Sequence, residues 1–432
     1  MEPYGIALIG CGTVGSGVAK LLLQESQRLE SRAGRPLQLR HVVVQNPDKP
    51  RPVPIPPKLI TTDFGKVLAD PQVQLVVEVV GGIDWAKQAI LDALAAGKDV
   101  VTANKALLAL HGEEMFNAGR QHDRSIAFEA AVAGGVPIVD AIGESLAANQ
   151  ISGILGILNG TSNYILTGMS KQGRSYEEVL AEAQEHGYAE ADPTFDVDGT
   201  DAAHKLAILA QIAFGVTVPF AEIDRIGISH IEQADIRYAD ELGYTIKLLA
   251  EAWMEENQLA LHVAPVLLRH RAPLAQVLGT YNAIQVVGDA VGDTIFYGQG
   301  AGMMPTASAV VADIIGMAVG RAQRTFQTLR LWSGAAHDIV IRPKTSVASR
   351  YSLRMLVEDR PGVMADVARV LAKHEISIMS VIQHEPTTEN DTAVQLIIMT
   401  HIIETGIFQK AVQELEALPA VLGPGVYFPV AD

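Results

Sequence analysis

The sequence predicts three folded regions: an α/β domain with an open parallel sheet, an α+β region, and a small ferredoxin-like βαββαβ domain. The first follows from an apolar strand at residues 4–10 that runs directly into a glycine-rich turn. The second follows from paired strands, which replace the strand–helix alternation after residue 135. The third follows from the order of strands and helices in residues 351–432.

Length and composition narrow the class of protein. The 432 residues carry a net charge of −16 at pH 7 and one cysteine, Cys11. Such a length allows several domains with large cores. The acidic balance, without any Lys/Arg block, argues against nucleic acid as a partner. A single cysteine cannot form an internal disulfide, which fits a cytoplasmic protein. We expect no signal peptide and no membrane partner, since the uncharged run 151–170 is interrupted by polar residues.

The glycine-rich turn follows the first strand and has the sequence GCGTVG. With a helix expected at residues 16–29, this is the context of a dinucleotide-binding Rossmann fingerprint. Gly10 permits the tight turn, Gly12 lets the backbone approach a pyrophosphate, and Gly15 lets helix and strand pack closely. The start of the helix would face the phosphates. These residues predict NAD or NADP as the cofactor.

The choice between the two cofactors depends on the end of the second strand, expected at residues 37–44. A strict NAD enzyme places an acidic residue there, against the ribose hydroxyls. Asp48 comes slightly late, while Lys49 and Arg51 would reach a 2′-phosphate. The residues leave NAD and NADP both open.

The alternation continues with strands at residues 75–80, 99–103 and 125–129 and helices at residues 84–96 and 106–120. Ligands of an open parallel sheet lie at the carboxyl ends of its strands. Lys105 follows one such end, and we favour a site role over an ordinary exposed lysine. Glu129 closes the next strand and could be a helix cap or a ligand.

The middle of the chain shows a different pattern. We expect a helix from residue 134, a strand at 150–158, a polar turn at 159–163, helices at 164–172 and 201–214, a local segment at 235–242, strands at 245–255 and 258–268, and a hairpin of 284–291 with 294–298 across Gly292-Asp293. The alanine-rich helix that opens at residues 298–308 and runs to about 329 is expected to return to the first domain.

The tail, after a polar connection, predicts strands at 352–357, 377–384, 392–399 and 426–430 and helices at 363–374 and 404–417. The predicted domains are therefore a Rossmann domain at 1–135 plus 300–335, a substrate-binding and dimerisation domain at 136–299, a linker at 336–349, and a sensor or oligomerisation domain at 350–432.

The acidic stretch 183–205 holds six carboxylates ahead of Lys205. Asp201 and Lys205 are i,i+4 neighbours on one face of the expected amphipathic helix. An acid and an amine in one small site suit proton transfer at an alcohol or carbonyl. Solvated surface is the simpler interpretation. A calcium loop around residues 196–199 is rejected because Lys205 would stand where the bidentate Glu belongs.

Several motifs resemble the homoserine dehydrogenase family with a C-terminal ACT domain. They are A-x3-G-Y-A-x2-D-P-x2-D-V-x-G-x-D-x3-K at residues 183–205, GCGTVG, TANK, EAAVAGGVPI, ILNGTSNYIL and GAGMMPTASAV. The resemblance covers nearly the whole chain. It implies NAD(P)-dependent interconversion of L-homoserine and L-aspartate 4-semialdehyde, in threonine, methionine and isoleucine biosynthesis.

By position, the resemblance implies roles for individual residues. The implied catalytic residues are Lys205, which exchanges the hydroxyl proton, its neighbour Asp201, and Lys105. The implied substrate-binding residues are Glu190, which holds the ammonium group, with Gly160, Thr161 and Asp196. The implied cofactor-binding residues are Gly10, Gly12, Thr13, Val14, Gly15 and Lys105. A sodium site is implied at Glu129 and the main-chain oxygens of Val132, Gly134 and Val136. Gln45 stands where many members carry an arginine that favours NADP.

The resemblance also implies a regulator and an assembly. Threonine is the implied effector, bound near Asp359, Gly362 and Val363, although the tail could instead serve only dimerisation. We expect a homodimer or homotetramer. Two other functions stay open: a reductase of another small amino-acid semialdehyde, and a catalytically silent Rossmann–ACT amino-acid sensor. A lysine serves as a base near neutrality only if its charged form is disfavoured; Lys105 would help and Asp201 would oppose this.

Overall fold

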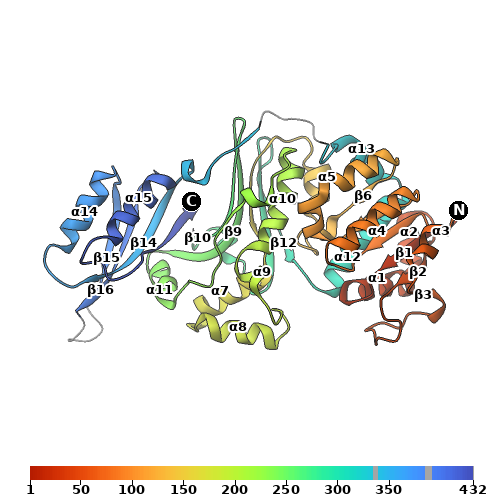
Figure 1. Cartoon of the computed structure of the whole chain (residues 1–432), viewed down its shortest axis with the longest axis horizontal. Coiled ribbons are helices and arrows are strands. Elements are labelled where there is room, and N and C mark those ends of the chain that lie inside the picture. Colours follow the sequence, from red (N-terminus) through yellow and green to blue (C-terminus); the bar gives the residue numbers. More distant parts are fainter. Residues whose placement is uncertain (334–338, 385–391, 432) are drawn as a thin grey trace. The chain divides into compact units, whose positions relative to one another are not determined.

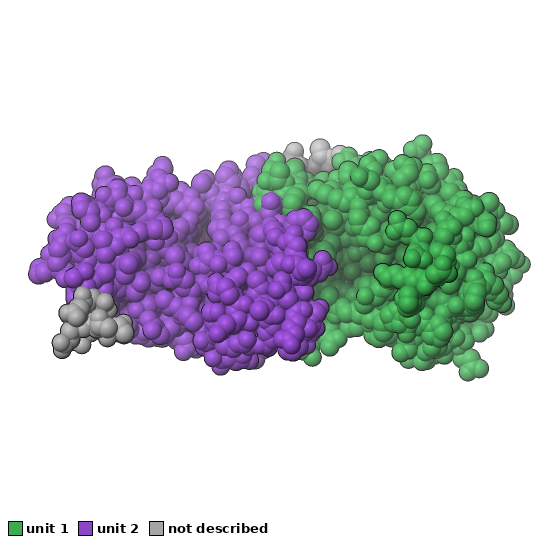
Figure 2. Space-filling model, turned by 60° about the horizontal axis from the view of Figure 1, so that its bottom comes forward, with its two compact units in different colours: residues 1–160, 201–223, 280–339 green, residues 161–200, 224–279, 340–432 purple. Residues whose placement is uncertain are grey.

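The computed structural model describes residues 1–333, 339–384 and 392–431. The chain forms two compact units, green and purple in Figure 2. The first holds residues 1–160, 201–223 and 280–339, and the second holds residues 161–200, 224–279 and 340–432. Because the chain passes between the units several times, neither is a continuous stretch. The domain limits expected from the sequence stay a prediction.

A parallel sheet forms the centre of the first unit (Figure 1), with the strand order β3-β2-β1-β4-β5-β6. Its strands are β1 (Tyr4–Ile9), β2 (Leu37–Val43), β3 (Ile60–Thr61), β4 (Leu75–Glu78), β5 (Asp99–Thr102) and β6 (Ile126–Ala127). Each neighbouring pair is parallel. The central strands β1, β4 and β5 are buried along their whole length, which explains their apolar sequences. This doubly wound order confirms the predicted Rossmann fold, whose ligands bind where the order reverses, between β1 and β4.

The helices of the first unit are α1 (Thr13–Gln24), α2 (Ser26–Ala33), α3 (Phe64–Ala69), α4 (Asp84–Ala95), α5 (Lys105–Gln121), α6 (Ile138–Asp140), α10 (Thr200–Phe214), α12 (Met303–Ala318) and α13 (Arg321–Leu329). Helix α4 packs against α5, and α1 against α12 (Figure 1). A Cβ atom on Gly17 would lie 2.7 Å from the carbonyl oxygen of Met303. The absence of a side chain at Gly17 therefore lets α1 and α12 approach closely.

Two helices are broken where the sequence predicted continuity. The helix expected at residues 16–29 begins at Thr13 and is interrupted at Glu25, so that Leu29 of α2 joins the core formed by α1. The helix expected to run to residue 329 bends by 89° between α12 and α13, where Gly320 has a left-handed φ of 79°. Among the described residues no single helix is long and apolar enough to cross a membrane, and α12 with α13 meets that test only as a bent pair.

Three antiparallel strands complete the first unit: β7 (Ile151–Ile157), β11 (Tyr281–Gly288) and β12 (Gly292–Gln299). The hairpin of β11 and β12 confirms the predicted pair. Its turn lies at residues 289–291, however, and not at Gly292-Asp293, because Gly288 pairs with Gly292. Asp289 holds this turn in place, since its carboxylate accepts a hydrogen bond from the Gln150 N–H at 2.9 Å.

The second unit begins with α7 (Gly160–Gln172), α8 (Tyr176–Glu185), α9 (Thr194–Val197), β8 (Asp224–Arg225), α11 (Gln233–Glu241), β9 (Tyr244–Glu255), β10 (Gln258–Arg269) and β13 (Val340–Ile341). The polar turn expected at residues 159–163 is wrong, because α7 already begins at Gly160. The polar side chains of its first turn are buried and hydrogen-bonded, which makes a helix of this composition stable.

The tail of the chain forms β14 (Ala348–Glu358), α14 (Val363–Lys373), β15 (Ile378–Gln383), β16 (Ala393–Thr400), β17 (Ile403–Glu404), α15 (Thr405–Glu416) and β18 (Val426–Ala431). The antiparallel order β18-β14-β16-β15 confirms the ferredoxin-like prediction. Helices α14 and α15 lie side by side and share one core with the sheet (Figure 1). Strand β18 also pairs with β10, so the tail is joined to the β9–β10 hairpin by main-chain hydrogen bonds.

Part of the predicted linker at residues 336–349 has regular structure. Residues 336–338 lie outside the described residues. Val340–Ile341 form β13, which pairs with β10, and β14 already begins at Ala348.

Candidate active site

The helix α10 brings Asp201 and Lys205 together, as their spacing predicts. Lys205 Nζ lies 2.7 Å from Asp201 Oδ2, and the two residues are only 8% and 6% exposed. The predicted amphipathic character of this helix is wrong, because all residues from 201 to 212 are buried. The ion pair therefore stands in a desolvated setting, where charge–charge interactions are strong.

Lys105 reaches the same carboxylate from the Rossmann sheet. It is the first residue of α5, directly after Asn104, whose side chain caps that helix by accepting the N–H of Leu107. Lys105 Nζ lies 2.9 Å from Asp201 Oδ1, so each oxygen of the carboxylate faces one ammonium group. Unlike Lys205, Lys105 has a side chain that is 42% exposed. The structure thus brings Lys105 of α5 to the Asp201–Lys205 pair of α10, which is far from it in the sequence.

Two further groups hold this cluster, and the sequence reasoning did not single them out. The side-chain amide of Asn159 donates a hydrogen bond to Asp201 Oδ2 at 2.9 Å. Lys205 Nζ donates to the carbonyl oxygen of Leu158 at 2.6 Å. Leu158 and Asn159 directly follow β7. Asn159 is the first polar residue after this apolar strand, and that position is the sequence feature that could have indicated it. We name Lys105, Asn159, Asp201 and Lys205 the lysine–aspartate cluster.

The charges of the cluster determine its ionisation. Burial acts to raise the pKa of Asp201, but the ammonium groups of Lys205 and Lys105 and their hydrogen bonds lower that pKa well below its usual value. Asp201 is therefore ionised throughout the neutral range. A buried carboxylate with two amines can hold one amine at a fixed position while that amine exchanges a proton.

The glycine-rich turn forms a cradle that fits a dinucleotide. Gly10 has a φ of 92°, and a Cβ atom on Gly15 would lie only 2.2 Å from the Gly10 carbonyl oxygen. A Cβ atom on Gly12, in contrast, would meet no atom within 4 Å. Packing therefore requires Gly15, whereas the open space at Gly12 fits the close approach of an external group such as a pyrophosphate. Thr13 and Val14 begin α1, so their N–H groups lie at a helix start.

The loop after β2 is held by its own residues. The Arg51 guanidinium donates hydrogen bonds to the carbonyl oxygens of Pro47, Lys49 and Asn46 at 2.9, 2.9 and 2.7 Å. The Asp48 N–H donates to the Asn46 side chain. Arg51 is thus engaged in shaping the loop. Of the two cations near the end of β2, Lys49 has fewer hydrogen bonds within the loop among the described residues and is the better candidate to contact a 2′-phosphate.

The segment that contains Glu129, Val132, Gly134 and Val136 is buried except at Gly135. The Glu129 carboxylate accepts the N–H groups of Val139 and Asp140 at 3.0 and 2.7 Å and so caps α6. Burial raises the pKa of Glu129 to about 7 in spite of these bonds. No group of three or more His, Cys, Asp or Glu suited to a metal occurs among the described residues. A cation here would depend mainly on main-chain oxygens.

The implied substrate residues of the second unit surround the start of α7. Thr161 Oγ1 donates to the Tyr188 carbonyl oxygen at 2.8 Å, and Ser162 Oγ donates to that of Asp196 at 2.7 Å. Glu190 is exposed in the loop after α8, and its carbonyl oxygen accepts a hydrogen bond from Gln184. Gly160, the last residue of the first unit, precedes Thr161 directly.

The implied effector residues lie between β14 and α14. Gly362 has a φ of 96° and precedes α14, whose first residue Val363 is buried in the core of the tail. The Asp359 N–H donates to the carbonyl oxygen of Thr392 at 2.8 Å.

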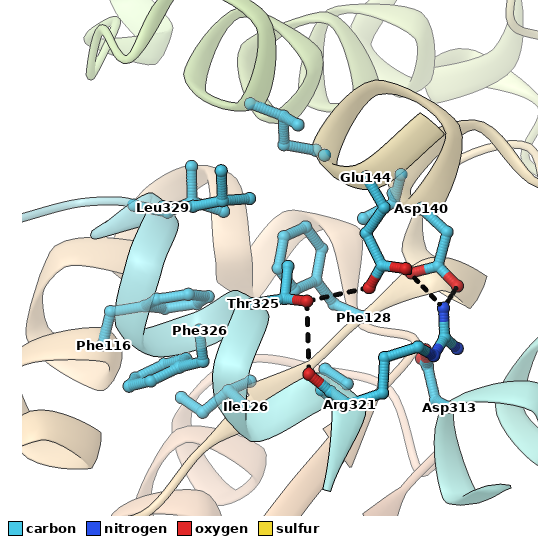
Figure 3. A pocket seen from close by; sticks show the side chains of 16 residues that line it. Phe116, Ile126, Phe128, Asp140, Glu144, Asp313, Arg321, Thr325, Phe326 and Leu329 are labelled. Atoms are coloured by element: carbon cyan, nitrogen blue, oxygen red, sulfur yellow. Dashed lines mark hydrogen bonds and ion pairs between the residues drawn. The ribbon is translucent and has the colours of Figure 1, made fainter. Parts of the chain in front are cut away.

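A cavity in the first unit has a volume of about 50 Å³ and is lined by apolar side chains with an ionic group on one side (Figure 3). Phe116, Phe128 and Phe326 form its apolar wall. On the other side Arg321 donates to Asp140 and Glu144 at 2.8 and 2.9 Å. No member of the lysine–aspartate cluster lines it, so this cavity is not the candidate active site.

Comparisons with known proteins agree on one family. Three family models match: the NAD-binding domain of homoserine dehydrogenase at residues 10–129, homoserine dehydrogenase at 137–315, and the ACT domain at 351–420. The homoserine dehydrogenase of Pseudomonas aeruginosa is 44% identical over 429 residues, which is 99% of this chain and 98% of that protein.

Solved structures agree as well. A homoserine dehydrogenase from Thiobacillus denitrificans covers 100% of this chain and 99% of its own, with a TM-score of 0.92 and 42% identity. A hyperthermophilic archaeal homoserine dehydrogenase mutant in complex with NADPH covers 73% of this chain and 97% of its own, with a TM-score of 0.61 and 26% identity.

Proposed function

Because this chain belongs to the homoserine dehydrogenase family and interconverts L-homoserine and L-aspartate 4-semialdehyde with NAD or NADP, we propose that Lys205 exchanges the hydroxyl proton in this reaction. The observation that carries this proposal is the buried Asp201 carboxylate held between Lys205 and Lys105. Two amines and one carboxylate at the carboxyl end of the parallel sheet suit an alcohol that loses a proton as its carbon loses a hydride.

The proton transfer follows from the contacts of Lys205. A nicotinamide cofactor held at the glycine-rich turn would supply the acceptor for the hydride that leaves the hydroxyl-bearing carbon. Neutral Lys205 takes the hydroxyl proton and becomes an ammonium ion, and it returns that proton in the reverse direction. Asp201 stabilises the ammonium form, while the Leu158 carbonyl oxygen and Asn159 keep the amine and the carboxylate in position. Lys105 places a second positive charge beside the reacting oxygen.

The ammonium and carboxylate groups of the substrate are assigned to the segment after α8 and to the start of α7. In this proposal the Glu190 carboxylate holds the substrate ammonium group, with Asp196 beside it, and the N–H groups at Gly160 and Thr161 face the substrate carboxylate. The hydrogen bonds of Thr161 to Tyr188, in the loop after α8, and of Ser162 to Asp196 of α9 support a single preformed surface.

For the cofactor, the open space at Gly12 and the start of α1 support binding of the pyrophosphate by Gly10, Gly12, Thr13, Val14 and Gly15. The NADPH complex of the archaeal relative favours testing NADP first. We further propose that a sodium ion binds the main-chain oxygens near Val132, Gly134 and Val136, with Glu129 fixing the segment, and that the assembly is a homodimer or homotetramer.

For regulation, we propose that threonine binds near Asp359, Gly362 and Val363 of the ACT domain. A chain of hydrogen bonds inside the second unit supports a coupling route. Arg354 of β14 donates to Asp235 at 2.6 and 3.2 Å. Gln233, two residues before Asp235 at the start of α11, donates to the carbonyl oxygens of Met169 and Arg174 at 2.9 Å each.

These carbonyls lie at and just after the end of α7, whose other end carries Thr161. A shift of the ACT sheet would therefore reach the substrate turn through one helix.

The deciding experiment is cofactor reduction with L-homoserine and either NAD or NADP. We expect turnover with at least one of them, and Lys205→Met is expected to lose roughly 10²–10⁴-fold in kcat, the usual span for general acid–base catalysis. Gel filtration and circular dichroism would show that the variant is folded. Near-normal kcat in a folded variant would contradict the role of Lys205, and absence of turnover in the wild type would contradict the function itself.

A further inference from the structure

Asn282 is a buried residue whose side-chain amide makes no hydrogen bond that would stabilise the described part of the fold. It lies near the start of β11 and is 1% exposed. Neither its Oδ1 nor its Nδ2 atom has a hydrogen-bond partner among the described residues. A buried amide without partners destabilises a protein, so such groups are rare and call for an explanation.

Two other buried asparagines, Asn159 between β7 and α7 and Asn163 in the first turn of α7, have hydrogen-bonded side chains. The Asn163 amide donates to the carbonyl oxygens of Val277 and Gly279, and its oxygen accepts from Lys247. Asn159 is bonded to Asp201. Asn282 differs from both, because its burial is as complete and its hydrogen-bonding capacity is unused.

The position of the amide links it to the site. A Cβ atom on Gly300 would lie 2.1 Å from Asn282 Oδ1 and 2.5 Å from Nδ2, and one on Gly160 would lie 3.6 Å from Oδ1. The amide is therefore enclosed by two glycines. Gly160 follows the residues that bind Lys205 and Asp201. Gly300 belongs to the segment 298–302 that leads into α12.

Glycine at these two places permits a peptide group to turn toward the amide. Segment 298–302 holds three glycines, and Gly302 has a φ of 126°, which favours glycine. The helix that follows packs against α1, the helix of the cofactor cradle. A ligand on α1 and a ligand beside Lys205 would thus press on the two segments that enclose Asn282.

We propose that Asn282 is a positioning residue for the reaction: its amide bonds the main chain of Gly160 and of segment 298–302 only when cofactor and substrate are bound. In the free enzyme the amide lacks hydrogen bonds, and in the complex with both ligands it forms them. This inference rests on the proposed function, because it requires that both ligands bind at these segments. It predicts that a variant without the amide is at least as stable as the wild type when free but gains less stability from the ligands.

The test uses Asn282→Leu, which keeps the size of the side chain and removes its polar atoms. The melting temperature is measured for the free enzyme and with NADPH plus L-homoserine, a pair that cannot react because both are reduced. We expect the free variant to melt at or above the wild-type temperature, the ligand-induced increase to be smaller, and KM for homoserine to rise roughly 2- to 10-fold. Asn163→Leu is the matched control, expected to lower the melting temperature of the free enzyme.

A lower melting temperature of free Asn282→Leu with an unchanged ligand-induced increase would overturn the proposal, because it would show an ordinary structural residue. If this variant does not fold, Asn282→Ala is compared with the wild type by hydrogen–deuterium exchange of segment 298–302. Ligand-induced protection in the wild type that the variant lacks supports the proposal, and equal protection in both overturns it. Wild-type turnover, measured in parallel, shows separately whether the proposed function holds.

Discussion

Replacing Asp201 by Asn tests the electrostatics of the lysine–aspartate cluster most directly. The amide keeps the shape of the side chain and removes its charge. Lys205, whose side chain is 10% exposed, would then lose its negatively charged partner while it still donates to the Leu158 carbonyl oxygen. Lys105 is 42% exposed and can turn to water. Removing one partner of a buried ion pair costs about 3–5 kcal/mol, so we expect a loss of this order in the free energy of unfolding at neutral pH.

The pH dependence of this loss follows from the pKa of Asp201. The lysines hold that pKa in the folded protein below the value of about 3.9 expected in the unfolded chain. The stabilisation is therefore fully present above pH of about 4 and is lost as the pH falls through the folded pKa. The difference between wild type and Asp201→Asn should shrink steadily in acid.

Urea unfolding followed by circular dichroism measures this difference, because urea is uncharged and does not screen the ion pairs. Glu185→Gln is the matched control: this exposed carboxylate comes from the same acidic stretch, and its replacement should change stability by no more than about 0.5 kcal/mol. A misplaced Lys205 should also lower kcat by roughly 10²-fold. Equal stability of wild type and Asp201→Asn, or a difference that does not depend on pH, would refute the reasoning.

Four other variants probe separate parts of the chain. Gly12→Ala should fold normally but raise KM for the cofactor roughly tenfold. Gly15→Ala should instead lower the free energy of unfolding by about 1–3 kcal/mol, because its Cβ atom meets a main-chain oxygen. Melting curves that show a loss of stability for Gly12→Ala, and cofactor titrations that show weaker binding only for Gly15→Ala, would contradict the roles given to these two glycines. Lys247→Met removes a buried amine whose pKa burial lowers to about 7. Because the unfolded lysine binds its proton up to about pH 10.4, wild-type stability should rise relative to this variant between about pH 7 and about pH 10, and parallel urea-unfolding profiles would argue against it. Gln233→Leu should leave kcat near normal and raise the threonine concentration for half-inhibition roughly 5-fold or more, if the hydrogen bonds to the end of α7 carry the coupling; unchanged inhibition would exclude this route.

Local spacing made several features predictable from the sequence. A strand that ends in GCGTVG predicts a tight turn into a helix, and the structure shows Gly10, Gly12 and Gly15 in that turn. The i,i+4 spacing of Asp201 and Lys205 needs only that α10 be a helix. The βαββαβ order of the tail also follows from the sequence, because each of its elements has a clear periodicity.

Where an element ends depends on packing, and the sequence was less informative there. Contacts with other parts of the chain accompany each difference between the expected and the observed boundaries. Leu29 packs into the core after the break at Glu25, hydrogen bonds hold the buried first turn of α7, and Asp289 of the turn at residues 289–291 accepts the N–H of Gln150. The burial of α10 on every side is of the same kind, since its charged residues suggested a solvated face.

By itself, the sequence determined the parallel-sheet domain, the glycine cradle, the acid–amine pair and the ferredoxin-like tail, because each depends on residues close together along the chain. Only the tertiary structure decided that Lys105 and Asn159 complete the Asp201 site, and that the buried amide of Asn282 has no hydrogen-bond partner in the described part of the chain. Those contacts join residues from different strands and helices. The order of strands in a sheet, and not the spacing of residues in a segment, determines which of them meet.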